Sequence, residues 1–393
     1  MLLILIVFFL LLTIIGHSIS RSMVSPYVIE SGVWTFMLFA YLILSPPFFP
    51  LENRFLPAIT IWVSFYFLSS ILAERIFSTL KWNRHKQEIN IKIWKILLVI
   101  SVTVTIFSCY ANIRDAFQNP EFFFVSLRSM NTGLDDSIKK DTTIWSYFFA
   151  AVSILYLAEL IRYPSKKIVF ILLFFVNLLF SFVTMAKTMF AQLFLTTMII
   201  LVVQKRIKLK HMIIPTAMLA VVMIMIQVVR ATDDDSENFS LVNFINIYLF
   251  SGMIAFDHAN LNFTDDGSHT FRLFYAIAHV FDDRVPVVNP ILDYSTISNA
   301  GDITNVYTGL YPFYADYGMF GIFVFSIIYG SFAGFLYSCS KYSYPALILY
   351  SIFATFSILI FLGDFFLTNL SLFIQYAFYS VILYYPKLCV FRR

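Results

Sequence analysis

The sequence predicts an all-α, polytopic membrane protein with about eleven transmembrane helices. Of its 393 residues, 60% are hydrophobic, 13% are charged and 19% are aromatic, including 46 Phe. Soluble proteins carry roughly 25% charged residues. The fraction of charged residues here is about half of that, which indicates that lipid surrounds most of the chain. Aromatic residues are enriched where transmembrane helices meet the membrane interface. We therefore expect a single helical bundle to accommodate the whole chain.

Each helix is expected where about 20 mostly apolar residues run together, because that length crosses the hydrocarbon core. The runs are 2–19, 33–49, 55–73, 94–111, 143–161, 168–185, 189–203, 212–229, 318–338, 346–362 and 372–385. The first run has no positively charged start and no small-x-small cleavage pattern. It is therefore expected to span the membrane rather than to act as a signal peptide.

Lys and Arg gather in four short segments, 74–95, 162–167, 204–211 and 387–393. All four fall on one side of the predicted bundle. That side is expected to be cytoplasmic, since cytoplasmic loops are enriched in basic residues. Almost all acidic residues fall on the other side, which indicates an external amino terminus and a cytoplasmic carboxyl terminus.

The predicted organisation has three parts. Residues 1–229 hold the first eight helices and an external loop near 112–141, residues 230–317 form a large external loop, and residues 318–393 hold the last three helices. Within the large loop, apolar spacings of three and four residues over 241–256 and 271–281 predict short helices.

Other stretches outside the predicted spans are shorter. Residues 285–290 and 301–305 are rich in Pro, Gly, Asn and Asp, so we expect irregular connections there. The apolar, aromatic stretch 121–126 predicts a helix lying in the membrane interface.

Composition also excludes several functions. The net charge of +4 comes from short loop clusters without a basic, aromatic-interleaved face, so no nucleic-acid partner is expected. Cys109, Cys339 and Cys389 lie apart, with no C-x-x-C pair, so neither a disulfide framework nor a metal site is expected. The chain has no Gly-rich phosphate loop, G-x-S-x-G or H-E-x-x-H, which argues against a nucleotide-driven pump.

Six basic residues stand at the predicted outer helix ends, where basic residues should be rare. They are Arg114, Arg128, Lys187, Arg230, Arg272 and Arg284. Any one of them could extend toward lipid headgroups, but six together favour an anion site. Arg suits phosphate because its planar fork makes bidentate contacts and stays charged. The natural anion is a lipid phosphate or diphosphate in the outer leaflet.

The large loop also holds carboxylates and histidines that could supply a general base. They are Asp257, His258, His269, His279, Asp282 and Asp283. The spacing of His279 and Asp282 places both on one helical face if the helix continues that far. The alternative is a solvated, acidic external loop.

Residues 267–273 read GSHTFRL, and residues 305–321 read NVYTGLYPFYADYGMFG and enter a helix with Gly330 and Gly334. Together these two segments resemble the bacterial O-antigen polymerase (Wzy) family. The family typically shows an N-V-Y-T segment and a D-[FY]-G-x-x-G helix entry after a late external loop. The resemblance includes the basic residue in the short turn at Lys187, although Arg is more usual there.

The resemblance implies a glycosyltransferase at the periplasmic face of the bacterial inner membrane. It would transfer a growing glycan from undecaprenyl diphosphate onto the next lipid-linked repeat unit, building lipopolysaccharide O-antigen. A diphosphate leaving group needs its charge stabilised, and no metal or soluble cofactor is required. A chain-length regulator protein is an implied partner, beside the lipid bilayer itself.

This implied reaction assigns roles to three groups of residues. For diphosphate recognition we expect Arg128, Lys187, Arg230 and Arg272. For the sugar site or the helix entry we expect Asn305, Tyr307 and Asp316. For the catalytic base the candidates are His258, His279 and Asp282.

Two other functions fit a lipid-linked oligosaccharide. A flippase would be expected to carry charges buried in mid-helix and pseudo-symmetric halves, whereas the apolar runs here are nearly free of charge. An O-antigen ligase would share the overall plan, but the segment 305–321 fits the polymerase better.

Overall fold

The computed structural model describes residues 1–51, 54–79, 88–118, 123–132, 143–162, 167–208, 211, 217, 221–222, 224–225, 241–258, 266–288 and 292–385. The chain forms two compact units. The first comprises Met1–Leu80, Phe239–Cys339 and Phe356–Ser371, and the second comprises Lys81–Asn238, Ser340–Thr355 and Leu372–Arg393. Each unit thus combines segments that are far apart in sequence, whereas the three predicted parts follow the order of the chain.

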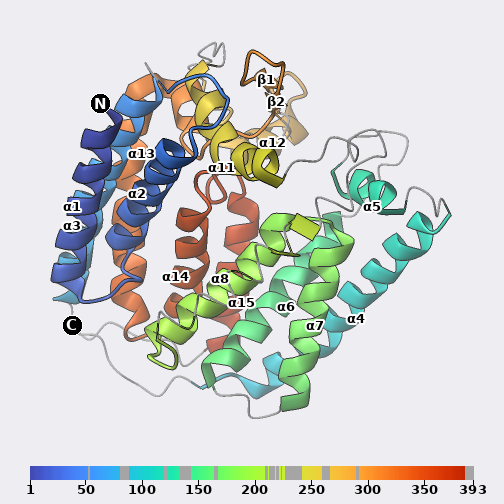
Figure 1. Ribbon diagram of the computed structural model, residues 1–393. Coiled ribbons are helices and arrows are strands. Elements are labelled where there is room, and N and C mark those ends of the chain that lie inside the picture. Colours follow the sequence, from blue (N-terminus) through green and yellow to red (C-terminus); the bar gives the residue numbers. More distant parts are fainter. Residues whose placement is uncertain are drawn as a thin grey trace. The chain divides into compact units, whose positions relative to one another are not determined.

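The first unit is built mainly of apolar helices. They are α1 (Leu2–Ser20), α2 (Pro26–Leu44), α3 (Phe55–Ser78), α11 (Leu241–His258), α12 (Arg272–Phe281) and nearly all of α13 (Tyr311–Ser340). Helices α1, α2 and α3 pack against one another (Figure 1). Strands β1 (Ser295–Thr296) and β2 (Ile303–Thr304) pair antiparallel.

The second unit contains α4 (Ile91–Ala116), α5 (Phe123–Thr132), α6 (Thr143–Arg162), α7 (Lys167–Val183) and α8 (Lys187–Val203). Most of α14 (Tyr344–Ile358) and α15 (Leu370–Tyr384) also belongs to it. Helix α5 covers part of the stretch in which an interfacial helix was predicted.

The described residues contain five helices long and apolar enough to cross a membrane, α1, α2, α3, α4 and α13. Helices α7, α8, α12, α14 and α15 are apolar but shorter. These helices support a membrane-embedded protein, and the count of eleven spans stays a prediction. The run predicted at 212–229 lies mostly outside the described residues.

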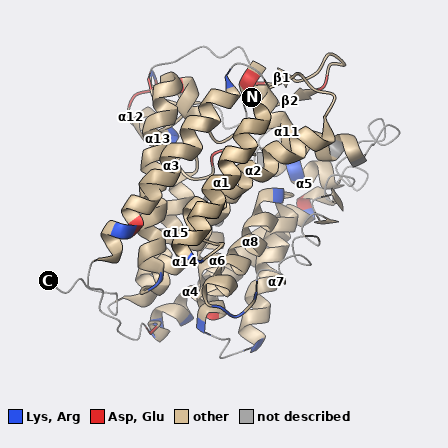
Figure 2. Ribbon diagram, turned by 60° about the vertical axis from the view of Figure 1, so that its left-hand side comes forward, with Lys and Arg blue, Asp and Glu red and all other residues tan. Residues whose placement is uncertain are grey.

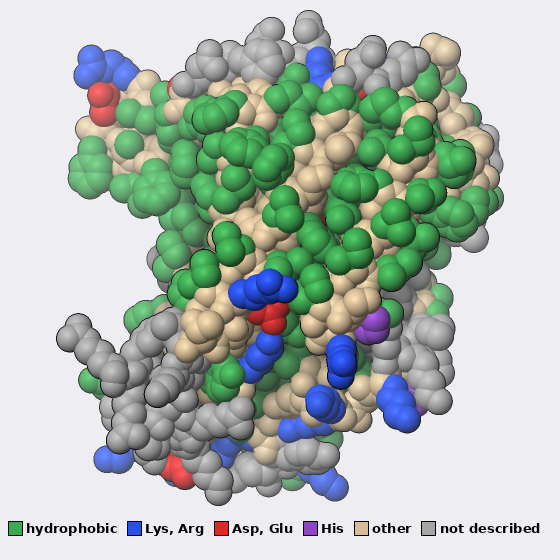
Figure 3. Space-filling view, turned by 90° about the vertical axis from the view of Figure 1, so that its left-hand side faces the viewer, with side chains coloured by type: hydrophobic (Ala, Val, Ile, Leu, Met, Phe, Trp, Pro, Cys, Tyr) green, Lys and Arg blue, Asp and Glu red, His purple; other side chains and the backbone are tan. Residues whose placement is uncertain are grey.

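The surface agrees with a lipid environment. Most Lys, Arg, Asp and Glu lie at helix ends and in connections (Figure 2), and hydrophobic side chains cover one broad face (Figure 3). On α1, Leu3, Ile4, Leu11 and Ile14 are all exposed. Exposed apolar surface of this extent would be unfavourable in water, so it is expected to face lipid.

Both ends of the helix predicted at 33–49 were wrong, and residues that start and stop helices explain the difference. Helix α2 begins at Pro26 rather than at 33, since Ser25 is extended and Pro is favoured at the first helical position. It ends at Leu44 rather than at 49, because Ser45 is left-handed and two prolines follow.

The prediction of an irregular connection at 301–305 was also wrong in part. Ile303 and Thr304 form β2, paired in register with Thr296 and Ser295. Ser298 closes the hairpin, because its Oγ donates to Asp302 Oδ2 at 2.6 Å.

Each unit has a basic end. In the first unit, α1 ends before Arg21 and α3 carries Arg75 in its last turn. The Tyr27 hydroxyl, in the first turn of α2, donates to Glu74 at 3.0 Å, which joins these helix ends. In the second unit, Arg206 donates to the carbonyl oxygens of Leu160 and Ile161 at the end of α6, at 2.5 and 2.6 Å.

The interior of the first unit holds one carboxyl group between two indoles. Glu30 is 1% exposed, and its Oε1 accepts hydrogen bonds from Trp34 at 2.9 Å and Trp62 at 2.8 Å. A buried acid needs such donors to offset lost hydration. The hydrogen bond from Trp62 to Glu30 connects α2 to α3. Trp62 also stacks on Phe313, so this connection lies next to the segment that carries the candidate site.

Candidate functional site

Helix α13 is broken at Gly318, whose φ of 61° and ψ of −149° suit only glycine. The chain reverses there, so the first turns of α13 fold back onto the rest of the helix. Phe313 therefore packs against Phe325 at 4.6 Å and Tyr329 at 5.3 Å between ring centroids. Broken helices of this kind occur within membranes where protein covers the backbone or where it lines a cavity.

The connection between α14 and α15 packs against this folded-back segment. The backbone N–H of Gly309 donates to the Ile360 carbonyl at 2.7 Å. The Tyr329 hydroxyl donates to Asp364 Oδ1 at 2.8 Å. A loop near the carboxyl terminus is thereby held beside the entry to α13.

The two sequence segments behind the family resemblance lie in direct contact. Asp316 is fully buried and accepts hydrogen bonds from the backbone N–H groups of His269 at 3.2 Å and Thr270 at 2.7 Å. The Thr270 hydroxyl donates to the Pro312 carbonyl at 3.2 Å. Gly267 has a φ of 83°, and a Cβ there would collide with the Tyr317 hydroxyl. These contacts set Arg272 at the start of α12.

A cavity of about 230 Å³ opens where these three segments meet. Its polar lining combines one cation, one carboxylate, amides and hydroxyls. The polar residues are Arg272, Asp364, Asn305, Asn369, Thr308 and Thr368, and the aromatic ones are Tyr307, Tyr311 and Phe365. This composition is suited to a polar ligand that carries a negative charge.

The negative charge of Asp364 acts on the Arg272 guanidinium. Burial lowers the pKa of the Arg272 guanidinium, and the negative charge of Asp364 is the largest influence that raises it again. Burial raises the pKa of the Asp364 carboxyl, and hydrogen bonds from Thr368, Phe366 and Tyr329 lower it. Protein atoms crowd Asp364, yet it keeps partial exposure at the cavity wall.

Three of the predicted site residues line this cavity. They are Arg272, Asn305 and Tyr307. The Tyr307 hydroxyl donates to the Asp293 carbonyl at 3.1 Å, so it presents mainly its ring. Asp316 is absent from the lining and instead holds the turn that carries Arg272.

The predicted base candidates lie elsewhere in the first unit, and none lines the cavity. His258 Nε2 hydrogen-bonds the Pro50 carbonyl at 2.8 Å. His279 Nδ1 hydrogen-bonds the Val285 carbonyl at 2.8 Å. Asp282 pairs with the exposed Arg284 at 3.0 Å.

The helix predicted over 271–281 is present as α12, and it does not continue to Asp282. Helix α12 ends at Phe281, and Asp282 is extended. The Asp282 carboxylate accepts a hydrogen bond from the backbone N–H of Arg284 at 3.1 Å. Local bonds of this kind compete with helix formation, so His279 and Asp282 do not share a helical face.

The other predicted diphosphate ligands fall outside the first unit. Arg128 is an exposed residue of α5, which packs on α7 through Phe124 and Phe182 at 6.2 Å between ring centroids. Lys187 is the first residue of α8 and is 7% exposed. Arg230 lies outside the described residues. Of the predicted diphosphate ligands that the structure describes, Arg272 is the one that lines this cavity.

Sequence reasoning missed Asp364. The available signal was an acidic residue directly after Gly363, in the short connection between the last two apolar runs. A carboxylate confined to so short a connection, on the predicted outer side, is expected at the membrane boundary, as is Lys187.

No family model matches this chain. Comparisons with curated proteins and with solved structures also found no match. Among the described residues, no three His, Cys, Asp or Glu side chains gather as metal ligands would.

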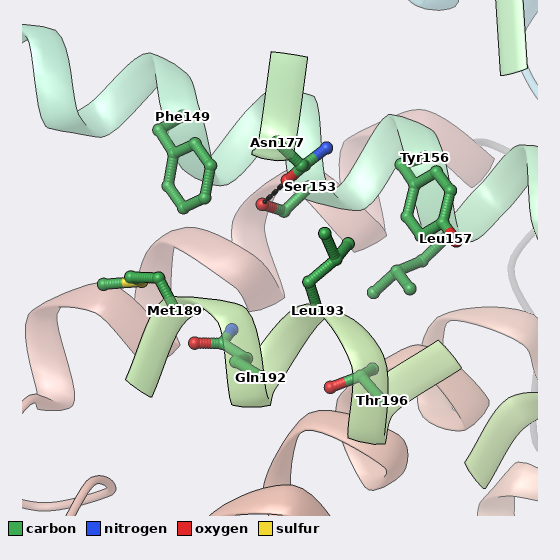
Figure 4. Close-up of a pocket in the computed structure, with 9 residues that line it drawn as sticks. All are labelled: Phe149, Ser153, Tyr156, Leu157, Asn177, Met189, Gln192, Leu193 and Thr196. Atoms are coloured by element: carbon green, nitrogen blue, oxygen red, sulfur yellow. Dashed lines mark hydrogen bonds between the residues drawn. The ribbon is translucent and has the colours of Figure 1, made fainter. Parts of the chain in front are cut away.

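A second cavity lies in the second unit among α6, α7 and α8 (Figure 4). Its volume is about 20 Å³, and Ser153 Oγ donates to Asn177 Oδ1 at 2.7 Å beside it. Gln192 and Thr196 also line it. A space of this size holds about one water molecule, so it is too small for a glycan.

Proposed function

We propose that this protein is a glycosyltransferase that polymerises lipid-diphosphate-linked oligosaccharide repeat units. The donor and acceptor are repeat units on undecaprenyl diphosphate, and the product is O-antigen polysaccharide. The reaction takes place at the periplasmic face of the bacterial inner membrane, with a chain-length regulator as partner.

The observation that carries this proposal is Arg272 at the wall of a polar cavity to which both segments that resemble the polymerase family contribute. Displacement at an anomeric carbon releases the lipid diphosphate with an added negative charge. A fixed guanidinium stabilises that charge as it develops, which lowers the barrier of the reaction.

The remaining lining supports a glycan rather than an apolar ligand. Asn305, Asn369, Thr308 and Thr368 offer amide and hydroxyl groups. Side chains of these types donate and accept hydrogen bonds, as sugar hydroxyls require. The aromatic ring of Tyr311 gives the cavity an apolar wall.

The proposal is tested by deleting the gene and separating the surface lipopolysaccharide on a gel. A core bearing a single repeat unit, without the ladder of longer chains, is expected for a polymerase. Complete loss of O-antigen with accumulated lipid-linked units would indicate a flippase or a ligase instead. An unchanged ladder would contradict a role in O-antigen.

Restoring the deletion strain with Arg272 variants tests the anion site. Arg272→Ala is expected to lower polymer formation by about 10²–10³-fold, the usual effect of removing one donor to a developing charge. Arg272→Lys should be intermediate, because it keeps the charge and loses the planar fork. The ladder intensity and the amount of membrane-inserted protein are measured together.

Arg284→Ala is the matched control for the Arg272 variants. Arg284 follows the same helix, but its side chain is 90% exposed and pairs with Asp282. It should therefore support a normal ladder. Equal ladders from the Arg272→Ala and wild-type proteins would contradict the proposed diphosphate site.

A further inference from the structure

The proposed reaction leaves one role unfilled, namely the group that takes the proton from the acceptor hydroxyl. The candidates read from sequence, His258, His279 and Asp282, do not line the cavity. Arg272 stays protonated and cannot act as a base. Within the described part of the chain, Asp364 is the one carboxylate on the cavity wall.

We infer that Asp364 is the catalytic base, which accepts the proton of the attacking sugar hydroxyl while Arg272 stabilises the departing diphosphate. This inference rests on the proposed function.

The hydrogen bonds of Asp364 leave room for this role. Tyr329 and the backbone N–H of Phe366 donate to Oδ1 at 2.8 and 3.0 Å, and the N–H of Thr368 donates to Oδ2 at 2.8 Å. A carboxylate has about four acceptor positions, so three donors orient it and one position stays open. Orientation by fixed donors is what a catalytic base requires, because proton transfer depends on short, aligned contacts.

A second observation indicates a hydroxyl-bearing ligand beside Asp364. Thr308 is 1% exposed, lines the same cavity, and its Oγ1 has no hydrogen-bond partner among the described residues. A buried hydroxyl without a partner is costly. A bound sugar would satisfy it, and the amides of Asn305 and Asn369 can orient the same ring.

The chemical step can be written in full. The acceptor oxygen attacks the anomeric carbon of the donor and forms the glycosidic bond. The bond between that carbon and the diphosphate oxygen breaks, and its electron pair leaves with the lipid diphosphate beside Arg272. The acceptor proton moves to Asp364 and is later released to water.

The test uses purified full-length protein in lipid nanodiscs. The substrate is the lipid-linked repeat unit that accumulates in the deletion strain, and binding is measured separately with undecaprenyl diphosphate. Asp364→Asn is expected to lower turnover by about 10²–10⁴-fold, the usual contribution of a general base. Its affinity for undecaprenyl diphosphate and its melting temperature should stay close to those of the wild type.

The pH profile separates a base from a structural anchor. Wild-type turnover should fall at low pH as the Asp364 carboxylate is protonated. The polar and charged groups that face this carboxylate are Tyr329 and Arg272. Tyr329→Phe removes one hydrogen bond that favours the carboxylate, so the acidic limb should move to higher pH. Asp302→Asn, a change at a carboxylate that does not line the cavity, should leave the profile unchanged.

Three results would overturn the inference. Turnover of Asp364→Asn within about threefold of the wild type would remove the need for this base. Parallel loss of binding, turnover and thermal stability would make Asp364 a structural residue. Retention of the anomeric configuration in the product, read by NMR, would make the carboxylate a nucleophile instead of a base. Failure of the wild-type protein to elongate the substrate at all would instead reject the proposed function.

Discussion

His269 lies in the turn that carries Arg272 and faces the ring of Tyr311 edge-on at 5.5 Å between centroids. Burial lowers the pKa of its imidazole, and the positive charge of Arg272 lowers it further, whereas Asp316 and Asp266 raise it. The imidazole is therefore favoured in its neutral form next to the guanidinium. A second positive charge at this point would weaken the turn that positions the anion site.

This lowered pKa has a defined consequence for stability. The folded protein binds a proton at His269 less readily than the unfolded chain does. The contribution of neutral His269 to folding stability is therefore fully present above the pKa of histidine in the unfolded chain, about 6.5. It is lost as the pH falls below that value. The wild-type melting temperature in detergent should therefore drop between pH 7.5 and pH 5.5, and the drop should be smaller for His269→Gln.

His17→Gln serves as the control for His269→Gln. His17 is exposed in the last turn of α1, and its replacement should keep the wild-type drop in melting temperature. Identical pH dependence of the wild type and His269→Gln would show that the histidine is not responsible.

At the scale of elements, the close contact of α13 with α3 depends on two glycines. A Cβ at Gly330 would collide with the Tyr66 carbonyl and Ser69, and one at Gly334 would collide with the Ser70 carbonyl. Small residues spaced four apart let helix backbones approach closely in membranes. The resulting contact supports Tyr329, which holds Asp364.

Gly330→Val is therefore expected to destabilise the protein by about 1–3 kcal/mol, the usual cost of overpacking a closely packed contact. Polymer formation should fall as well, because α13 carries the site. Gly32→Ala is the matched control, since the nearest atom to its Cβ is a Thr13 methyl at 3.8 Å. That control should be neutral or stabilising by up to about 1 kcal/mol. Thermal unfolding of both variants in detergent measures the difference, and equal melting temperatures would contradict the role of the glycine contact.

At the scale of the whole molecule, the first unit has a basic end and a cavity-bearing end. Arg75 lies in the last turn of α3. The start of α3 is capped by the Asp257 carboxylate, which accepts hydrogen bonds from the backbone N–H groups of Arg54 and Phe55 at 2.7 and 2.8 Å. Helix α12 and Arg284 also belong to this unit. The positive-inside rule predicts that Arg75 faces the cytoplasm and that Arg284 faces outward.

Cysteine labelling tests this orientation. In a background without Cys109, Cys339 and Cys389, a membrane-impermeant thiol reagent should label Arg284→Cys in spheroplasts. Arg75→Cys should react only after the membrane is permeabilised. The reverse pattern would invert the topology and would place the cavity on the cytoplasmic side, which contradicts the proposed reaction.

Much of the fold and part of the site could be predicted from local sequence. The helices α1, α3, α6 and α8 lie within a few residues of predicted runs, because each is an uninterrupted apolar stretch. Arg272, Asn305 and Tyr307, which line the cavity, could be selected from sequence because they stand in recognisable segments. The base candidates do not line this cavity, since residue type shows which groups can titrate but does not show which of them face the same cavity.

By itself, the sequence determined the membrane character of this protein, most helix positions and the segment that bears Arg272, because hydrophobicity and local spacing act along the chain. Only the tertiary structure decided that the chain reverses at Gly318 and that Asp316 joins two distant turns. It also brought Asp364, from the connection before the last helix, to the cavity wall near Arg272. These are contacts between residues far apart in sequence, and packing and hydrogen bonding across the folded chain determine them.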